Sequence, residues 1–190
     1  VASPYFYGPL YQNPLRRIAE KLRFDAVCSD RGPEFCICAT NVRSGKIRVF
    51  DAAEIGPDQI MASACIPTLF QAVEIDGEAY WDGGYMGNPA LFPLFQPQLP
   101  NDIVIVNINP LERREIPKTP QEIQNRINEI SFNSSLLREL RAISFVKRLI
   151  HDGIVENRGM KDVYVHMIAD DEMMQRLSVA TKLLPTPSVL

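Results

Sequence analysis

The sequence has no hydrophobic run long enough to span a membrane, and it lacks a strong excess of charge of one sign. No apolar stretch approaches the roughly 18 residues that a transmembrane helix needs. The formal net charge is −3 over 190 residues, and the basic residues are scattered rather than clustered. Nucleic-acid binding needs a basic patch or stripe. These absences argue against a transmembrane helix and against a nucleic-acid partner.

Cysteine and histidine are also scarce. The four cysteines are Cys28, Cys36, Cys38 and Cys65. Cys36 and Cys38 lie two residues apart on an expected strand, so their side chains share one face. That spacing is not usual for zinc, and both histidines lie far away in the sequence. We therefore expect buried free thiols, no metal and no cofactor, and free thiols favour a reducing, cytoplasmic location.

Helical and strand patterns alternate along the chain, which indicates an α/β fold without an internal linker. The expected helices are 14–24, 57–66 and 119–153, and the expected longer strands are 34–42, 46–50, 102–109 and 162–168. Because 102–109 is almost continuously apolar, residues 103–106 are all expected to be buried, as in a parallel sheet under helices. The apolar residues of 123–150 form two stripes that change phase near 133–135. This change predicts two helices or a kink.

The segment Tyr80–Pro89 carries the best candidate for chemistry. Residues 72–82 have the pattern of a β-hairpin with a two-residue turn at Asp76-Gly77, so Asp82 falls where the second strand ends. Gly83 and Gly84 follow at once and keep side-chain bulk away from this carboxylate. An isolated Asp-Gly-Gly is usually only a turn, so the surrounding sequence has to decide.

Small residues and a proline precede this hairpin, and an Asn-Pro pair follows it. Ser63, Ala64 and Pro67 lie before Asp82-Gly83-Gly84, and Asn88-Pro89 comes after. In this order and spacing, together with the expected strand pair at 38–54, the segment resembles the second half of a patatin-like phospholipase domain. The region 123–150 resembles that of a bacterial subgroup of the family. The resemblance implies a three-layer sandwich with a mainly parallel central sheet, incomplete in this chain.

The Gly-x-Ser-x-Gly nucleophile motif of that family is missing from all 190 residues. We therefore interpret residues 1–190 as the C-terminal portion of one longer patatin-like domain, with no internal boundary. The Gly-rich oxyanion loop of the family is also missing. The chain alone is expected to be inactive as a hydrolase.

The resemblance implies a lipid acyl hydrolase of the phospholipase A or lysophospholipase type that uses a Ser–Asp dyad without histidine. Asp82 would be the general base, with Gly83 and Gly84 completing the motif, and at least one of the two glycines is expected to have an unfavourable backbone conformation. Asp82 is expected at an open rim facing a cleft, beside an exposed sheet edge. Its aromatic and apolar neighbours Tyr80, Trp81, Tyr85 and Met86 are expected to desolvate it and raise its pKa.

Other interpretations stay open. His151 lies at an expected helix end and His166 within a strand, and neither matches a catalytic position of the family. The expected partner is a lipid or other ester, with peripheral membrane contact as a further expectation. Two alternatives are a non-catalytic binding or signalling protein on a patatin-like fold, and an acyltransferase or thioesterase of related architecture.

Overall fold

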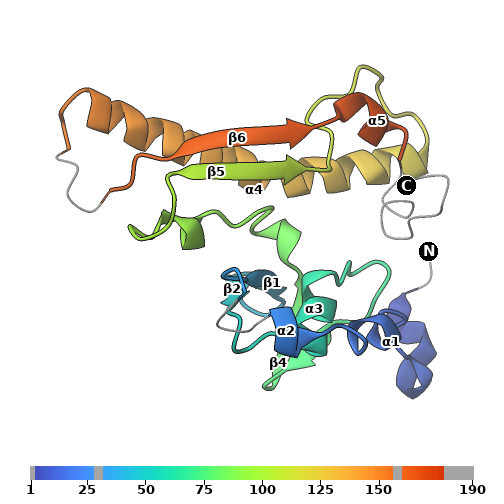
Figure 1. Cartoon of the computed structure of the whole chain (residues 1–190). Coiled ribbons are helices and arrows are strands. Elements are labelled where there is room, and N and C mark those ends of the chain that lie inside the picture. Colours follow the sequence, from blue (N-terminus) through green and yellow to red (C-terminus); the bar gives the residue numbers. More distant parts are fainter. Residues whose placement is uncertain (1–2, 28–31, 156–159, 178–190) are drawn as a thin grey trace. The chain divides into compact units, whose positions relative to one another are not determined.

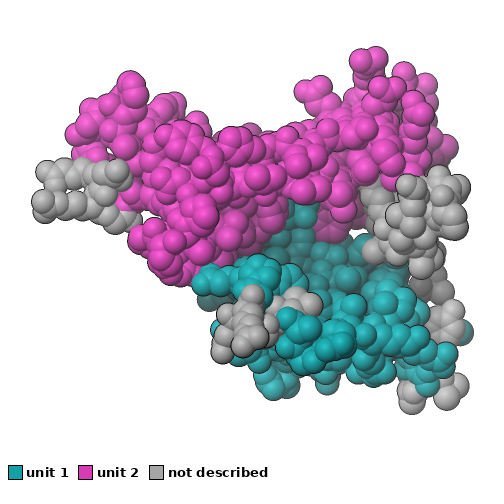
Figure 2. All heavy atoms as spheres, in the orientation of Figure 1, with its two compact units in different colours: residues 1–88 teal, residues 89–190 magenta. Residues whose placement is uncertain are grey.

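The computed structural model describes residues 3–27, 32–155 and 160–177. By its internal contacts the chain divides into two units, residues 1–88 and 89–190, which are coloured separately in Figure 2. We describe each unit by itself. The assignment of both units to one domain stays a prediction.

Unit 1 is built on a four-stranded antiparallel sheet with strand order β2-β1-β4-β3. Its strands are β1 (Ile37–Asn41), β2 (Ile47–Phe50), β3 (Val73–Ile75) and β4 (Glu78–Asp82). Its helices are η1 (Pro4–Leu10), α1 (Arg16–Ala19), α2 (Phe24–Val27), α3 (Pro57–Ser63) and η2 (Gly83–Tyr85). The expected helix 14–24 is therefore much shorter than its pattern suggested.

The β3–β4 hairpin forms as predicted. Asp76 and Gly77 have φ values of 52° and 78°, so both turn residues occupy the left-handed region that a tight two-residue hairpin requires. β3 pairs with β4 from Val73 opposite Tyr80 to Ile75 opposite Glu78. The local Asp-Gly signal thus fixes both the turn and the register.

Helix α3 packs on this sheet and supplies much of the core of unit 1. Met61 and Ala62 of α3 are buried in one cluster with Phe50 and Tyr80. The Phe50 and Tyr80 rings meet edge to face, with centroids 5.7 Å apart. Small residues at the end of α3 allow its close approach to β1 and β4.

Unit 2 combines a two-stranded parallel sheet with one long helix. The elements are η3 (Phe92–Phe95), β5 (Asp102–Asn107), α4 (Pro120–His151), β6 (Tyr164–Ala169) and α5 (Asp171–Gln175). Figure 1 shows β5 and β6 side by side, with α4 running along one face of the pair. Leu136 and Ile143 of α4 pack with Ile103 and Ile105 of β5 in the core of this unit.

The prediction that residues 103–106 are all buried is wrong. Ile103 and Ile105 are 4% and 2% exposed, whereas Val104 and Val106 are 59% and 68% exposed. Alternate side chains of a strand point to opposite faces, and α4 covers only one face of β5. An almost continuously apolar strand sequence therefore does not imply that helices cover both faces of this strand pair.

Of the two alternatives expected within 119–153, two separate helices are wrong, because α4 is one continuous helix. Its start and end are as expected: Thr119 and Glu122 form a capping box, and Gly153 has a φ of 65° just beyond the C-terminus. The two apolar stripes lie on different faces of the helix. Ile127 and Ile130 are exposed, whereas Leu136 and Ile143 are buried against the sheet.

Helices and sheets together confirm the α/β class. The described strands form three antiparallel pairings and one parallel pairing, so a mainly parallel three-layer sandwich is not confirmed. Within the described ranges, none of the helices is both long and apolar enough to cross a bilayer.

Candidate active site

The backbone of Asp82 is held on both sides at the end of β4. Its N–H donates to the carbonyl of Cys65, at 2.9 Å, and its carbonyl accepts a hydrogen bond from Thr40 Oγ1, also at 2.9 Å. Asp82 stands opposite Ala39 of β1. β3 pairs with β4 only as far as Tyr80, so the exposed sheet edge that we expected beside Asp82 stays a prediction.

The carboxylate of Asp82 is half-buried and accepts one hydrogen bond from the part of the chain that the structure describes. Its Oδ1 accepts from the N–H of Gly84 at 2.8 Å, which caps helix η2. Within residues 3–27, 32–155 and 160–177, no arginine or lysine forms an ion pair with it. Burial raises the pKa of Asp82 to about 6, and the bond from Gly84 opposes this rise. The expected desolvated carboxylate is present.

Gly83 is required by a close approach rather than by its backbone angles. A Cβ built on Gly83 would lie 2.2 Å from the Cys38 carbonyl oxygen and 2.7 Å from its Sγ. The glycines with positive φ in the described residues are Gly8, Gly45, Gly77 and Gly153. The prediction of an unfavourable conformation at Gly83 or Gly84 is therefore wrong, and contact with β1 explains the need for glycine at 83.

Weak acids surround Asp82. Cys65 is fully buried, its Sγ donates to the carbonyl of Gln71 at 3.1 Å, and burial and the nearby Asp82 raise its pKa to about 12. Burial is also the main cause of the raised pKa of Tyr85, and the nearby charge of Asp82 raises this pKa further. Both groups stay neutral near pH 7. Neither group therefore supplies a positive charge that would lower the basicity of Asp82.

The predicted apolar neighbours divide between two environments. Tyr80 is buried in the core and Trp81 is packed against it, whereas Met86 is 41% exposed. The buried indole Nε1 of Trp81 has no hydrogen-bond partner among the described residues. The exposed Met86 therefore contributes less to the burial of Asp82 than expected.

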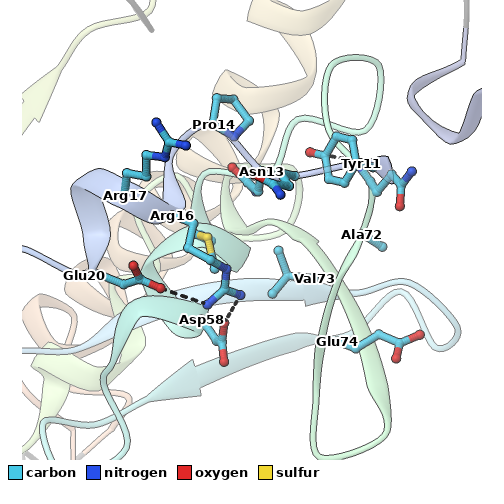
Figure 3. Close-up of a pocket in the computed structure, with 13 residues that line it drawn as sticks. Tyr11, Asn13, Pro14, Arg16, Arg17, Glu20, Asp58, Ala72, Val73 and Glu74 are labelled. Carbon is cyan, nitrogen blue, oxygen red and sulfur yellow. Dashed lines mark hydrogen bonds and ion pairs between the residues drawn. The ribbon is translucent and has the colours of Figure 1, made fainter. Parts of the chain in front are cut away.

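A cavity of about 930 Å³ in unit 1 does not include Asp82 (Figure 3). It lies among the N-terminal segment, α3 and β3, and some of its charged residues form ion pairs. Arg16 forms an ion pair with Asp58 at 2.7 Å and a longer one with Glu20 at 3.6 Å. The expectation that Asp82 faces a cleft is not supported by this cavity, which we do not assign to the chemistry.

Among the described residues, neither histidine forms a hydrogen bond or ion pair with Asp82. His151 ends α4 beside Asp152, and His166 of β6 lies 2.8 Å from Asp102 Oδ1; both side chains are well exposed. Cys36 is exposed, contrary to the expected burial, because it precedes β1 rather than lying within it. Cys28 falls outside the described residues. Among the described residues, no cluster of three or more His, Cys, Asp or Glu side chains suits a metal ion.

A known protein family matches the part of the chain that holds Asp82. The patatin-like phospholipase family model matches residues 5–95. This match is consistent with a partial patatin-like domain in the chain. The matched range includes the whole Asp82–Gly84 motif and most of unit 1, which confirms the resemblance inferred from the sequence. No curated protein sequence matches the chain.

Several residues that position Asp82 were not identified from the sequence. Thr40 and Cys38 lie more than 40 positions before Asp82, and only the β1–β4 pairing brings them to it. Cys65 contributes through its backbone carbonyl, which no side-chain pattern reveals. The sequence pattern of 34–42 predicted a strand there. It did not predict that this strand pairs with the one that ends at Asp82.

A second polar cluster, in unit 2, was also missed. Glu129 is 2% exposed and binds Arg113 through two hydrogen bonds, of 2.6 and 2.8 Å. Arg126 donates to Glu129 and to the backbone carbonyls of Pro110 and Leu111. These contacts join α4 to the segment that follows β5, so we interpret the cluster as structural.

Proposed function

We propose that this chain is part of a lipid acyl hydrolase that uses a Ser–Asp dyad, with Asp82 as its general base. The observation that carries the proposal is the carboxylate itself. It is desolvated enough to have a pKa of about 6, has no basic partner among the described residues, and sits in a family motif at a strand end. A general base works best when its pKa lies near the operating pH.

The proton transfers follow from this assignment. A serine hydroxyl attacks the ester carbonyl while Asp82 takes its proton, and the collapse of the intermediate returns that proton to the leaving alcohol. Water then enters, Asp82 takes one of its protons, and the acyl group leaves as a carboxylic acid. The proton bound by Asp82 returns to the serine, which completes the cycle.

Two components of this reaction are expected outside the 190 residues. The sequence contains no Gly-x-Ser-x-Gly, so the nucleophile and the donors that stabilise the oxyanion belong to another part of the polypeptide. That part is also expected to complete the three-layer fold and to leave these 190 residues inactive by themselves. The proposed location of the whole protein is cytoplasmic, with peripheral contact with its lipid substrate.

One observation supports a second candidate, a binding or signalling protein without catalysis. Asp82 Oδ1 caps helix η2 through the N–H of Gly84. Aspartate is a favoured N-cap residue for this purely structural reason. The high pKa weakens this candidate, because a carboxylate kept only as a cap gains stability from full ionisation near a helix N-terminus.

An active-site-directed fluorophosphonate separates these candidates, because it labels only an activated serine. The intact polypeptide that contains this chain should be labelled at a serine outside residues 1–190, and Asp82→Asn should slow the labelling strongly. Asp76→Asn is the matched control, since Asp76 is a turn residue of the same hairpin and asparagine also tolerates a positive φ. Absence of labelling would favour the binding protein, and a label within residues 1–190 would contradict the dyad.

A further inference from the structure

The outer face of α4 combines apolar and basic side chains. Its exposed apolar residues are Ile123, Ile127, Ile130, Leu137 and Phe145. Ile127 and Ile130 are 51% and 54% exposed, and Phe145 is 54% exposed. Spacings of three, four, seven and eight residues place all five along one line of the helix. This stripe continues toward Arg148 and is roughly 38 Å long at 1.5 Å per residue.

The stripe is not needed for the core of unit 2. The opposite face of α4 already packs against the sheet through Leu136 and Ile143, which join Ile103, Ile105 and Val163 in one cluster. Burial of Phe132 on the inner side agrees with this orientation. α4 is thus apolar on two opposite faces, and the outer face lies open.

The charges on this face have one sign. Arg138, Arg141 and Arg148 are exposed along the C-terminal half of the stripe, and none of their guanidinium groups forms an ion pair or hydrogen bond with another described residue. The exposed carboxylate of α4, Glu122, is engaged at the helix N-terminus with the backbone N–H groups of Lys118 and Thr119. The outer face of α4 therefore presents three arginines, and the exposed acid that follows the helix, Asp152, lies 3.2 Å from His151 Nδ1.

We propose that this face of α4 binds an anionic lipid bilayer. Aliphatic and aromatic side chains enter the boundary between headgroups and acyl chains, while arginines extend to the lipid phosphates. Basic residues at such a surface are attracted by anionic lipids. In this arrangement α4 lies parallel to the bilayer surface, with its outer face toward the lipids.

A second copy of the chain fits this face less well. Antiparallel pairing centred on Ser134 would place Arg141 opposite Ile127 and Arg138 opposite Ile130. Parallel pairing would place each arginine near the same arginine of the second chain. Neither arrangement supplies a carboxylate, whereas coiled-coil pairs use opposite charges beside the apolar seam. Charge complementarity thus favours an anionic surface.

The test uses the 190-residue chain and its binding to vesicles, so it has no catalytic readout and is independent of the proposed function. Vesicles of phosphatidylcholine alone are compared with vesicles of phosphatidylcholine and phosphatidylglycerol in equal parts, by co-sedimentation at low and high salt. Binding is expected only to the anionic vesicles and should weaken with salt. The whole chain carries a net charge of −3, which anionic vesicles repel. Binding to them therefore requires a local cluster of basic side chains.

The triple variant Arg138→Gln, Arg141→Gln, Arg148→Gln should weaken binding by about 100-fold, since each basic residue near an anionic surface contributes roughly a factor of five. Replacing Ile127 and Ile130 by serine should also weaken it, with the arginines intact.

The matched control changes Arg17, Lys21 and Lys46 to glutamine, which removes the same charge from exposed positions of unit 1. It should bind like the wild type. Circular dichroism confirms that all variants remain folded.

Three results would overturn the proposal: no binding to the anionic vesicles, equal loss in the control variant, or binding that survives both outer-face variants. A dimer in sedimentation velocity that is lost on Ile127→Ser would instead assign the face to a second copy of the chain.

Discussion

Replacement of Asp82 by asparagine should change how the stability of the chain depends on pH. The amide still accepts the hydrogen bond from the N–H of Gly84, but it cannot ionise. The variant therefore separates the charge of Asp82 from its role as a cap. The comparison needs only the 190-residue chain.

The magnitude follows from the raised pKa. Burial moves the pKa of Asp82 from its ordinary 3.8 to about 6, and each pKa unit is worth about 1.4 kcal/mol. Well below pH 4 the carboxyl group is neutral in both the folded and the unfolded protein. Between about pH 4 and pH 6 the unfolded chain loses its proton first, so the wild type becomes less stable relative to the variant. Above this window the difference should have grown by about 3 kcal/mol.

Urea denaturation at a series of pH values between about 4 and 8 measures this difference directly. The free energy of unfolding of Asp82→Asn minus that of the wild type should rise with pH and then level off. Asp76→Asn is the control from the same hairpin. It shows how much the removal of one carboxylate alone changes the pH dependence of stability. Parallel curves for Asp82→Asn and wild type would refute the claim that Asp82 is desolvated in the folded chain.

Three further predictions concern the fold and the activity. Gly83→Ala should destabilise the chain by at least about 2 kcal/mol, because the new Cβ would overlap the Cys38 carbonyl. In the same denaturation assay Gly56→Ala should cost less, since its Cβ would lie 3.4 Å from its nearest neighbour. Glu129→Gln should cost about 3 kcal/mol, since it leaves Arg113 without its buried counter-ion, and a loss as small as that for the exposed Glu172→Gln would contradict this. The 190 residues alone should release nitrophenol from a short-chain nitrophenyl ester only at the background rate. Sustained turnover that survives Asp82→Asn would reveal a nucleophile that we have overlooked.

Local signals predicted the parts of the fold that depend on neighbouring residues. The Asp76-Gly77 turn, the Thr119–Glu122 capping box and the end of α4 at Gly153 were all expected and are present. Each depends on hydrogen bonds or backbone angles within a few residues. The placement of Asp82 at a strand end follows from the same hairpin.

Long-range packing explains the errors. The apolar run in β5 did not reveal that only one of its faces would be covered, because that depends on where α4 lies. The two apolar stripes of α4 suggested a break in the helix. Apolar periodicity alone does not distinguish such a break from one helix with two separate apolar faces. The need for glycine at 83 arises from Cys38, which reaches it only through β1–β4 pairing.

The most direct test of Asp82 as general base is kcat/KM for ester hydrolysis by the polypeptide that unites this chain with its Gly-x-Ser-x-Gly segment. We predict that Asp82→Asn lowers kcat/KM by at least about 10²–10⁴-fold, the usual effect of removing a general base, while the protein stays folded. Asp76→Asn should retain nearly full activity. A folded Asp82→Asn enzyme with kcat/KM close to that of the wild type would contradict the account.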